Sequence, residues 1–312
     1  MEKIKKDVTV VGGANVDIGG KPDKQLIMRD SNPGTVQTSL GGVGRNIAHN
    51  LALLGNSVRF ISAIGEDAHA RQILEGCREL MIDTDSCLRT EEAPTSTYIY
   101  ITNQKGDMEA AISDMRIAEY LTPEFIQSKM DVIHQSSLLV IDTNLPEETV
   151  HTLAKRTRLP VFAETVSRAK AEKLRAVLPY LHAITPNALE AEILSGRKVN
   201  PDKESSVAKA ADVLLARGVR QVVITLGERG AYFADGESRG FVRSIPCNPV
   251  SVNGAGDALI AGLVTGFLKQ LPLSESVRLG AAAAAFTLEA TAANYPELTL
   301  QKVAERANVT VL

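Results

Sequence analysis

The sequence contains 312 residues, of which 44% are hydrophobic and 23% are charged, and its formal net charge is −3. This length allows a large buried core, and the small negative charge argues against binding to nucleic acid or to an anionic membrane surface. The cysteines Cys77, Cys87 and Cys247 lack metal-ligand spacing, so we expect reduced thiols. No apolar run approaches the roughly 20 residues of a membrane span, and no secretory pattern opens the chain, so we expect a cytoplasmic protein.

Along the chain, strand patterns alternate with helix patterns. Hydrophobic periodicity predicts helices at residues 44–55 and 205–217, and strands at residues 7–13, 57–65, 138–141, 160–163, 182–184 and 221–225. No linker or internal repeat divides the sequence, so we expect a single α/β domain over residues 1–312. The alternation predicts a central, mostly parallel sheet with helices on both faces, in which ligands collect at the carboxyl ends of the strands.

Two segments, of about residues 14–40 and 95–115, interrupt this alternation and are predicted to form a small β lid. In the second segment, a strongly β-forming stretch is followed by a turn at residues 103–107 and another strand. In the first, glycine and proline residues precede a strand-like stretch that ends at Leu40. We expect an antiparallel flap over the edge of the sheet. The alternative is a pair of surface insertions without function, although long loops at this end of a sheet often form lids.

The residues Gly254-Ala255-Gly256-Asp257 lie directly before a helical pattern of small and apolar residues. Unpaired N–H groups and the macrodipole favour an anion at a helix N-terminus, and glycine lets a phosphate approach the backbone. Asp257 has two interpretations. It caps the helix, which is the favoured explanation for an isolated motif, or it is the base for a nucleophile that attacks the bound phosphate.

Polar residues also follow the first predicted strand. Asn15 and Asp17 offer hydrogen-bonding groups there, although taken alone they are typical of a turn. Residues 41–46 (GGVGRN) precede a helix. Gly42 and its neighbouring glycines permit close approach of a ligand, and Asn46 can hydrogen-bond a hydroxyl group. A flexible turn explains this motif equally well.

Two later motifs suit a nucleotide. Asn187 and Glu190 lie three residues apart on one helical face, where an amide oxygen and a carboxylate can hold the water ligands of Mg²⁺. Taken alone, this pair is better explained as an N-terminal cap. Thr225, Gly227 and Gly230 follow a strand and can lie along a nucleotide, although a glycine-containing turn is the simpler explanation.

Together, the order and placement of these five motifs resemble the ribokinase-like family of carbohydrate and nucleoside kinases, also called the phosphofructokinase-B family. The resemblance covers nearly the whole sequence, and its most specific part is the Gly-Ala-Gly-Asp motif that ends at Asp257. Competing nucleotide-binding classes are disfavoured, because no strand is followed by the GxGxxG pattern of dehydrogenases and no P-loop GxxxxGK[ST] occurs.

The resemblance implies a ribokinase-like fold, ATP and Mg²⁺ as cofactors, and a role for each motif. Asp257 would be the general base. The remaining roles implied are an anion hole from Gly254, Ala255 and Gly256; Mg²⁺ positioning by Asn187 and Glu190; ATP contacts from Thr225, Gly227, Gly230, Gly254 and Gly256; and sugar contacts from Asn15, Asp17, Gly42 and Asn46.

Within the family, residues 30–34, 41–48 and 112–115 resemble the pseudouridine kinases more than the ribokinases. This implies phosphorylation of the 5′-hydroxyl of pseudouridine, with lid residues such as Asp30 and Ser31 contacting the base, whose edge offers donors and acceptors. The alternatives are a ribokinase, an adenosine kinase or another sugar kinase. A non-catalytic nucleoside or sugar sensor on the same fold is a further alternative, against which an intact Asp257 argues.

The sequence departs from the family pattern at two places. Ser251 stands where potassium-activated members commonly have Asp, which puts a potassium site in doubt. Glu164 stands where many relatives have Asp, and Lys170 nearby is expected either to pair with it or to point at a phosphate of the substrate. The outer face of the lid is expected to form a homodimer with a second copy, as in related dimers.

Overall fold

The computed structural model describes residues 6–311. Its core is an eight-stranded sheet with the order β14-β13-β12-β11-β10-β9-β1-β4. Six of these strands are parallel, and β13 and β14 form an antiparallel hairpin at one edge. In chain order the strands are β1 (Lys6–Val11), β4 (Val58–Ile61), β9 (Ser136–Asp142), β10 (Val161–Glu164), β11 (Ala183–Ile184), β12 (Gln221–Thr225), β13 (Ala231–Ala234) and β14 (Arg239–Val242).

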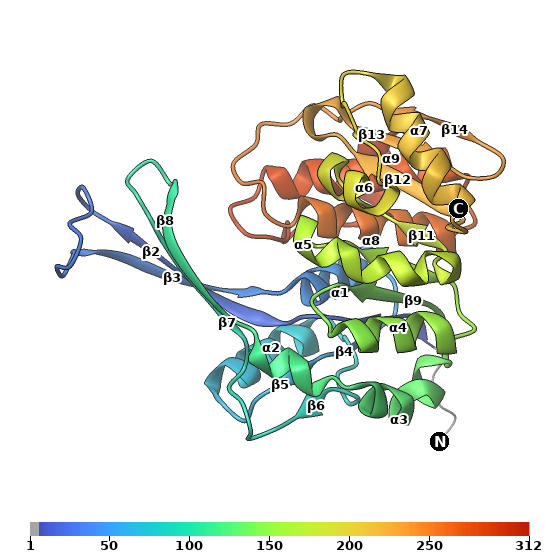
Figure 1. Cartoon of the computed structure of the whole chain (residues 1–312). Helices are drawn as coiled ribbons and strands as arrows, with labels where there is room; N and C mark the ends of the chain where they lie inside the picture. Colours follow the sequence, from blue (N-terminus) through green and yellow to red (C-terminus); the bar gives the residue numbers. More distant parts are fainter. Residues whose placement is uncertain (1–5, 312) are drawn as a thin grey trace.

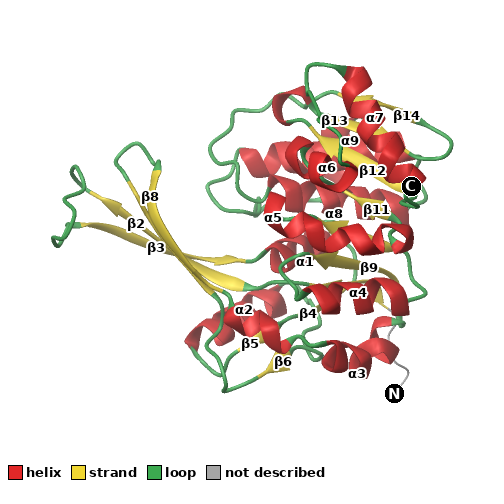
Figure 2. Cartoon of the chain, in the orientation of Figure 1, coloured by secondary structure: helices red, strands yellow, loops and turns green. Residues whose placement is uncertain are grey.

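Helices cover both faces of this sheet (Figures 1 and 2). Successive residues of one strand point to opposite faces, so Val140 packs in one hydrophobic cluster and Ile141 in the other. The first cluster includes residues of α1 (Val43–Leu53), α2 (Ala68–Glu79), α8 (Ala255–Leu268), α9 (Leu273–Leu288) and α10 (Leu300–Ala307). The second includes residues of η1 (Arg116–Tyr120), α3 (Pro123–Ile133), α4 (Glu147–Arg156), α5 (Arg168–Ala171), η2 (Glu172–Tyr180), α6 (Ala188–Ser195) and α7 (Glu204–Ala216).

The packing of α8 on α9 depends on glycine. A Cβ atom on Gly262 would lie 2.6 Å from the Cα atom of Gly280, so only a side chain of one hydrogen lets the two helices approach this closely. The small-residue stripe predicted after Gly254 is therefore a helix contact surface. None of the helices in residues 6–311 has the length and apolar character that a membrane crossing requires.

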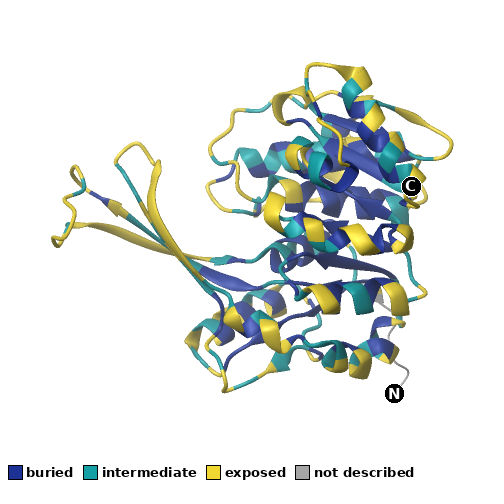
Figure 3. Cartoon of the chain, in the orientation of Figure 1, coloured by how far each residue is buried: buried dark blue, intermediate teal, exposed yellow. Residues whose placement is uncertain are grey.

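The lid is a separate four-stranded sheet with the order β3-β2-β7-β8, made by β2 (Asn15–Pro22), β3 (Gly34–Gly41), β7 (Thr97–Thr102) and β8 (Met108–Asp114). The predicted hairpins exist, but an entirely antiparallel flap is wrong because β2 and β7 pair in parallel. Both strands leave the body in the same direction. The lid projects away from the body and does not lie over the edge of the sheet (Figure 1), and its outer half is largely exposed (Figure 3).

The predicted strands and helices are confirmed with small shifts of their ends, except for the strand at residues 57–65. The chain there forms β4 and then β5 (Ala63–Ile64), separated by Ser62. β5 pairs with β6 (Leu88–Arg89) and does not continue the main sheet.

Candidate active site

The carboxyl ends of the central strands converge on the first turn of α8. Asp142 ends β9 and Glu164 ends β10, and the two residues are direct partners in the parallel ladder. The charge of Asp142 raises the pKa of Asp257, and the charge of Asp257 raises the pKa of Glu164. Ligands of open α/β sheets bind at this edge, so the predicted location of the site agrees with the fold.

The first turn of α8 leaves its backbone N–H groups without a side-chain partner. Gly254 precedes the helix with a left-handed φ of 78°, and a Cβ atom there would lie 2.0 Å from the carbonyl oxygen of Ala293. Among the described residues, no side chain caps this helix, so its first N–H groups have no side-chain acceptor. Gly256 faces open space, because no described atom outside its own helix lies within 4 Å of the place that a Cβ atom would take. Asp257 therefore makes no capping hydrogen bond, although its carboxylate lies in the first turn of α8, where it offsets the helix dipole.

Asp257 is buried, with 7% of its surface exposed, and it is oriented by Asn46. The amide Nδ2 of Asn46 donates a hydrogen bond to Oδ2 of Asp257 at 2.7 Å. In the described part of the chain, no donor reaches the other oxygen, Oδ1. The side-chain polar atoms that are shielded from solvent and also lack a hydrogen-bond partner belong to Asn50, His182 and Thr287, and Oδ1 of Asp257 is not one of them. Oδ1 of Asp257 therefore still reaches solvent.

Burial raises the pKa of Asp257 to about 7. The nearby Asp142 adds to this rise, whereas the hydrogen bond from Asn46 and the positive charge of Arg45 oppose it. A carboxyl group with a pKa near neutrality and one open oxygen can accept a proton and release it again.

The base of the lid brings Asn15, Asp17 and Gly42 toward this centre. Asn15 and Asp17 lie in β2 and not in a turn, and Nδ2 of Asn15 donates to Oδ1 of Asp17 at 2.5 Å. Burial raises the pKa of Asp17, although Asn15 and the charge of Arg45 oppose the rise. Gly42 adopts a φ of 96°, and a Cβ atom there would lie 2.5 Å from Cα of Ala14, so glycine is required where the lid meets the body.

Asn187 and Glu190 form a capping box at the start of α6. The backbone N–H of Glu190 donates to Oδ1 of Asn187 at 3.0 Å, and the N–H of Asn187 donates to Oε2 of Glu190 at 2.9 Å. Thr165 also donates to that Oε2 through its hydroxyl, at 2.6 Å. The cap interpretation is thus confirmed. The capping box does not use Oε1 of the buried Glu190. Among the described residues this oxygen has no donor, and it still reaches solvent.

The segment after β12 lies beside this capping box. The N–H of Thr225 donates to the carbonyl oxygen of Pro186 at 2.9 Å, and Thr225 forms a parallel bridge with Asn187. Gly227 begins η3 (Gly227–Arg229) with open space around it. Gly230 differs, because a Cβ atom there would lie 2.1 Å from the carbonyl oxygen of Val242. The structure therefore gives Gly230 a packing function against β14.

Glu164 and Lys170 do not form an ion pair, so that alternative is wrong. Oε2 of Glu164 accepts a hydrogen bond from the hydroxyl of Thr185 at 2.6 Å. Nζ of Lys170 donates to Oδ1 of Asn144 at 2.5 Å, which places this cation just beyond the end of β9. Burial raises the pKa of Glu164 to about 8. Lys170 lies at the carboxyl edge of the sheet. The alternative that it points at a phosphate of the substrate stays a prediction.

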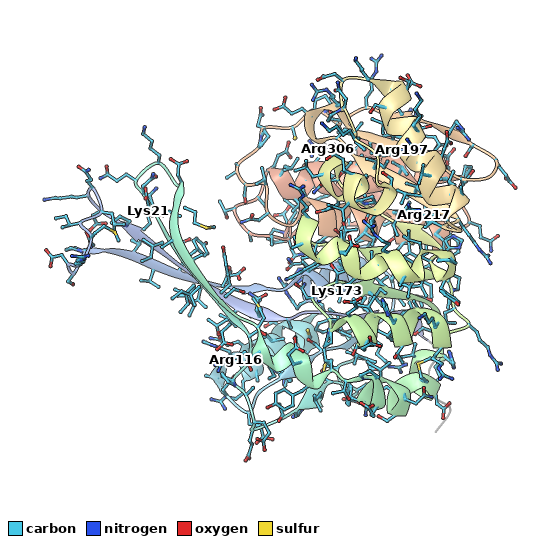
Figure 4. The ribbon with its side chains drawn as sticks, viewed as in Figure 1. Lys21, Arg116, Lys173, Arg197, Arg217 and Arg306 are labelled. Atoms are coloured by element: carbon cyan, nitrogen blue, oxygen red, sulfur yellow. The ribbon has the colours of Figure 1, made fainter. Side chains whose placement is uncertain are left out.

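Asp30 and Ser31 are not brought to Asp257 within one chain. They lie in the exposed loop between β2 and β3, at the outer end of the lid. The eight residues of β2 extend about 26 Å at 3.3 Å per residue. Figure 4 shows Lys21 far out on the lid and Arg116 at its base.

Ser251 lies in a local turn, in which its Oγ accepts a hydrogen bond from the N–H of Asn253 at 3.2 Å.

The sequence analysis missed Asp142. This residue is fully buried and accepts hydrogen bonds from the backbone N–H groups of Gly13 and Asn144, each at 2.8 Å. Burial raises its pKa, although these hydrogen bonds oppose the rise. A Cβ atom on Gly12 would lie 2.3 Å from Oδ2 of Asp142. The signal was present in the sequence as a carboxylate that closes an otherwise apolar strand.

The raised pKa of Glu164 makes stability depend on pH. The folded protein holds this proton up to about pH 8, whereas the ordinary value is 4.5. Stability supplied by this group is therefore complete below pH 4.5 and is lost as the pH rises toward 8, by at most about 1.4 kcal/mol per pH unit.

We expect Glu164→Gln, which mimics the protonated acid, to flatten this decline. The measurement is the free energy of unfolding in urea between pH 5 and pH 8, with the exposed Glu148→Gln as a control that follows the unsubstituted protein. Equal slopes for all three proteins would contradict the assignment.

Comparison with known proteins identifies the family. The family of pfkB carbohydrate kinases matches residues 5–300. A pseudouridine kinase of Escherichia coli K12 is 36% identical over 299 residues, covering 95% of each chain. The uncharacterized sugar kinase YeiI of the same organism is also 36% identical, over 294 residues that cover 93% of this chain and 80% of YeiI. The solved structure of a carbohydrate kinase from Agrobacterium tumefaciens superposes with a TM-score of 0.86 at 28% identity, covering 98% of each chain.

The likeness to the solved kinase confirms the ribokinase-like fold predicted from the motifs. Because the family match extends over almost the entire sequence, the chain belongs to the pfkB family of carbohydrate kinases and is a phosphotransferase.

Proposed function

We propose that this kinase transfers the γ-phosphoryl group of ATP to the 5′-hydroxyl of pseudouridine, with Asp257 as the general base. The observation that carries the proposal is the position of Asp257 in the first turn of α8, with Oδ1 open beside N–H groups that no side chain caps. The 36% identity to a pseudouridine kinase supports the substrate.

In the proposed reaction, Asp257 accepts the proton of the substrate hydroxyl. The hydroxyl oxygen forms a bond to the γ-phosphorus while the bond from that phosphorus to the oxygen of ADP breaks. The pKa of about 7 suits this exchange, because a base of that strength is about half ionised at neutral pH and can both take up and release a proton. Phosphoryl transfer otherwise needs positioning and charge stabilisation, which rigid surroundings supply.

The N-terminus of α8 provides the charge stabilisation. The N–H groups of Ala255, Gly256 and Asp257 and the helix dipole face negative charge on the transferred group. Gly254 supports this arrangement, since its left-handed φ turns the chain into the helix where no larger residue fits.

ATP and Mg²⁺ fit the capping box and the segment after β12. Asn187 and Glu190 would hold Mg²⁺ through its water ligands, and Oε1 of Glu190 is the open oxygen that this requires. Mg²⁺ would neutralise phosphate charge during transfer. Thr225 and Gly227 would contact ATP, because the space around Gly227 is open.

The base of the lid would hold the sugar. Asn15 and Asp17 lie on β2, which begins directly after Ala14, the residue packed against Gly42, and their side chains offer a donor and an acceptor for sugar hydroxyls. Asp17 shares a lid face with Tyr98, to which it is paired directly. The rings of Tyr98 and Tyr100 lie 5.7 Å apart on this face, which suits a nucleobase better than a bare pentose.

The competing substrates are other sugars and nucleosides. YeiI is as similar to this chain as the pseudouridine kinase is, so a different sugar acceptor is the second candidate. A ribokinase or adenosine kinase activity has the same catalytic requirements at Asp257. A non-catalytic sensor disagrees with the family match, because the chain is a phosphotransferase.

Asp257→Asn is expected to lower kcat by about 10²–10⁴-fold, because the amide cannot accept the proton of the hydroxyl. Binding of ATP should change little. The measurement is steady-state turnover together with nucleotide binding, and Asp131→Asn, an exposed residue on α3, is the control. Turnover close to that of the unsubstituted protein would remove Asp257 from the chemistry.

A panel of acceptors tests the substrate. Pseudouridine, uridine, adenosine, ribose and fructose are each offered with ATP, and ADP formation is measured as kcat/KM. We expect the highest value for pseudouridine. A higher value for ribose or fructose would reject pseudouridine as the substrate while leaving the kinase chemistry in place.

We also propose that the lid forms a homodimer. Ile18, Ile99 and Ile112 are paired directly across three strands, so they share one face, which Val36 extends. Ile112 is 71% exposed and Val36 is 72% exposed. A continuous exposed apolar face of this kind is typical of a protein interface, and a second copy presents an equally apolar surface.

Sedimentation of the unsubstituted protein at micromolar concentration should therefore give a dimer, and Ile112→Lys should give a monomer. Tyr180→Lys, at an exposed aromatic residue on the body, is the control that should remain dimeric. A monomeric unsubstituted protein would exclude this interface.

A further inference from the structure

Arg45 lies at the junction between the lid and the body. It belongs to the first turn of α1, and only 4% of its surface is exposed. Its guanidinium donates hydrogen bonds to the carbonyl oxygens of Leu40, at 2.5 Å from Nη2, and Gly41, at 3.3 Å from Nε. These two residues end β3, where the lid joins the body. The cation therefore fastens the end of a lid strand to α1.

The same guanidinium fixes the amide of Asn46. Nη2 of Arg45 donates to Oδ1 of Asn46, and Nδ2 of Asn46 donates to Oδ2 of Asp257. Arginine has donors and no acceptor, so Asn46 must present its oxygen to Arg45 and its NH₂ group to Asp257. A flipped amide would place NH₂ against a cation and oxygen against a carboxylate, losing both hydrogen bonds.

Other charges around this pair do not replace Arg45. Asp257 is influenced by Asp142 at the end of β9 and acts on Glu164 at the end of β10, and both are acids. Arg45 is the cation that acts on Asp257 among the described groups.

Besides Asp257 of α8, the groups that face Arg45 come from three elements. They are Asp17 of β2, Cys77 of α2 and His49 of α1, whose Nδ1 lies 3.1 Å from Nη1. Burial and the neighbouring Arg45 lower the pKa of His49 to about 4, so this imidazole is neutral where the enzyme works. Arg45 thus stands between an acid of the lid and an acid of the body.

We infer that Arg45 is a positioning residue that joins the lid to the proposed general base: it fastens the end of β3 and holds Asn46 so that the amide donates to Asp257. The inference rests on the proposed role of Asp257 and assigns no contact with substrate to Arg45. Loss of Arg45 removes both a nearby positive charge and the partner that orients Asn46.

The test is the pH dependence of kcat for Arg45→Met. Its acidic limb should move to higher pH by about 1 unit, because Asp257 loses both a nearby positive charge and the partner that orients the amide of Asn46. Turnover should then be about tenfold lower on the acidic limb and should recover toward that of the unsubstituted enzyme as the pH rises. Recovery at high pH separates this effect from a general loss of structure.

Arg59→Met is the matched control, because Arg59 is also buried but pairs with Asp83 and the carbonyl oxygen of Val132, away from Asp257. Its acidic limb should not move. Arg45→Lys, which restores the charge but not the planar fork, should shift the limb less than Arg45→Met. If Arg45→Met does not fold, Arg45→Gln replaces it, being neutral and still able to donate to a carbonyl oxygen, with the same upward shift expected.

An acidic limb unchanged in folded Arg45→Met or Arg45→Gln would overturn the inference. Comparison with Asp257→Asn separates the two claims. If Asp257→Asn is inactive and the Arg45 variants keep the normal limb, only the role of Arg45 fails. If Asp257→Asn is active, the general-base proposal itself fails.

Discussion

A carboxylate buried at the start of a helix is the constraint on which the site depends. Removing Asp257 from water is unfavourable for its charged form, and a neighbouring acid adds to that cost. The dipole of α8, the amide of Asn46 and the charge of Arg45 offset it. The resulting balance leaves an acid that titrates near neutrality and keeps one oxygen open. A free surface aspartate would be ionised but too weakly basic to serve the same chemistry.

The other acids at this edge coexist because each has its own donors. Asp142 accepts two backbone N–H groups, Glu164 accepts the hydroxyl of Thr185, and Glu190 closes the capping box of α6. These fixed hydrogen bonds hold the carboxyl groups in place, which is the preorganisation that phosphoryl transfer requires. The capping box uses only one oxygen of Glu190, so it leaves the other oxygen free for the proposed binding of Mg²⁺.

The two faces of the lid sheet carry different residues, because successive residues of each strand point to opposite faces. One face carries Asp17 and the two tyrosines of β7, and the other carries Ile18 and Ile99. Because one pleated sheet bears both, the surface proposed for substrate and the surface proposed for the dimer belong to the same rigid unit. Its junction with the body lies at Leu40 and Gly41, which are the residues that Arg45 fastens. The lid and the proposed general base, Asp257, are therefore neighbours in the fold.

The sequence by itself determined the α/β class, the lid segments and the glycine turn before the helix that carries Asp257, because periodicity and glycine placement are local properties of the chain. Tertiary structure alone decided the parallel pairing of β2 with β7, the distance of Asp30 from the body and the partners of Lys170. It also revealed Asp142 and joined Arg45 to Asn46, whose amide bonds an acid 211 positions further along the chain. These contacts arise between strands and helices remote in sequence, and only close packing in the folded chain specifies them.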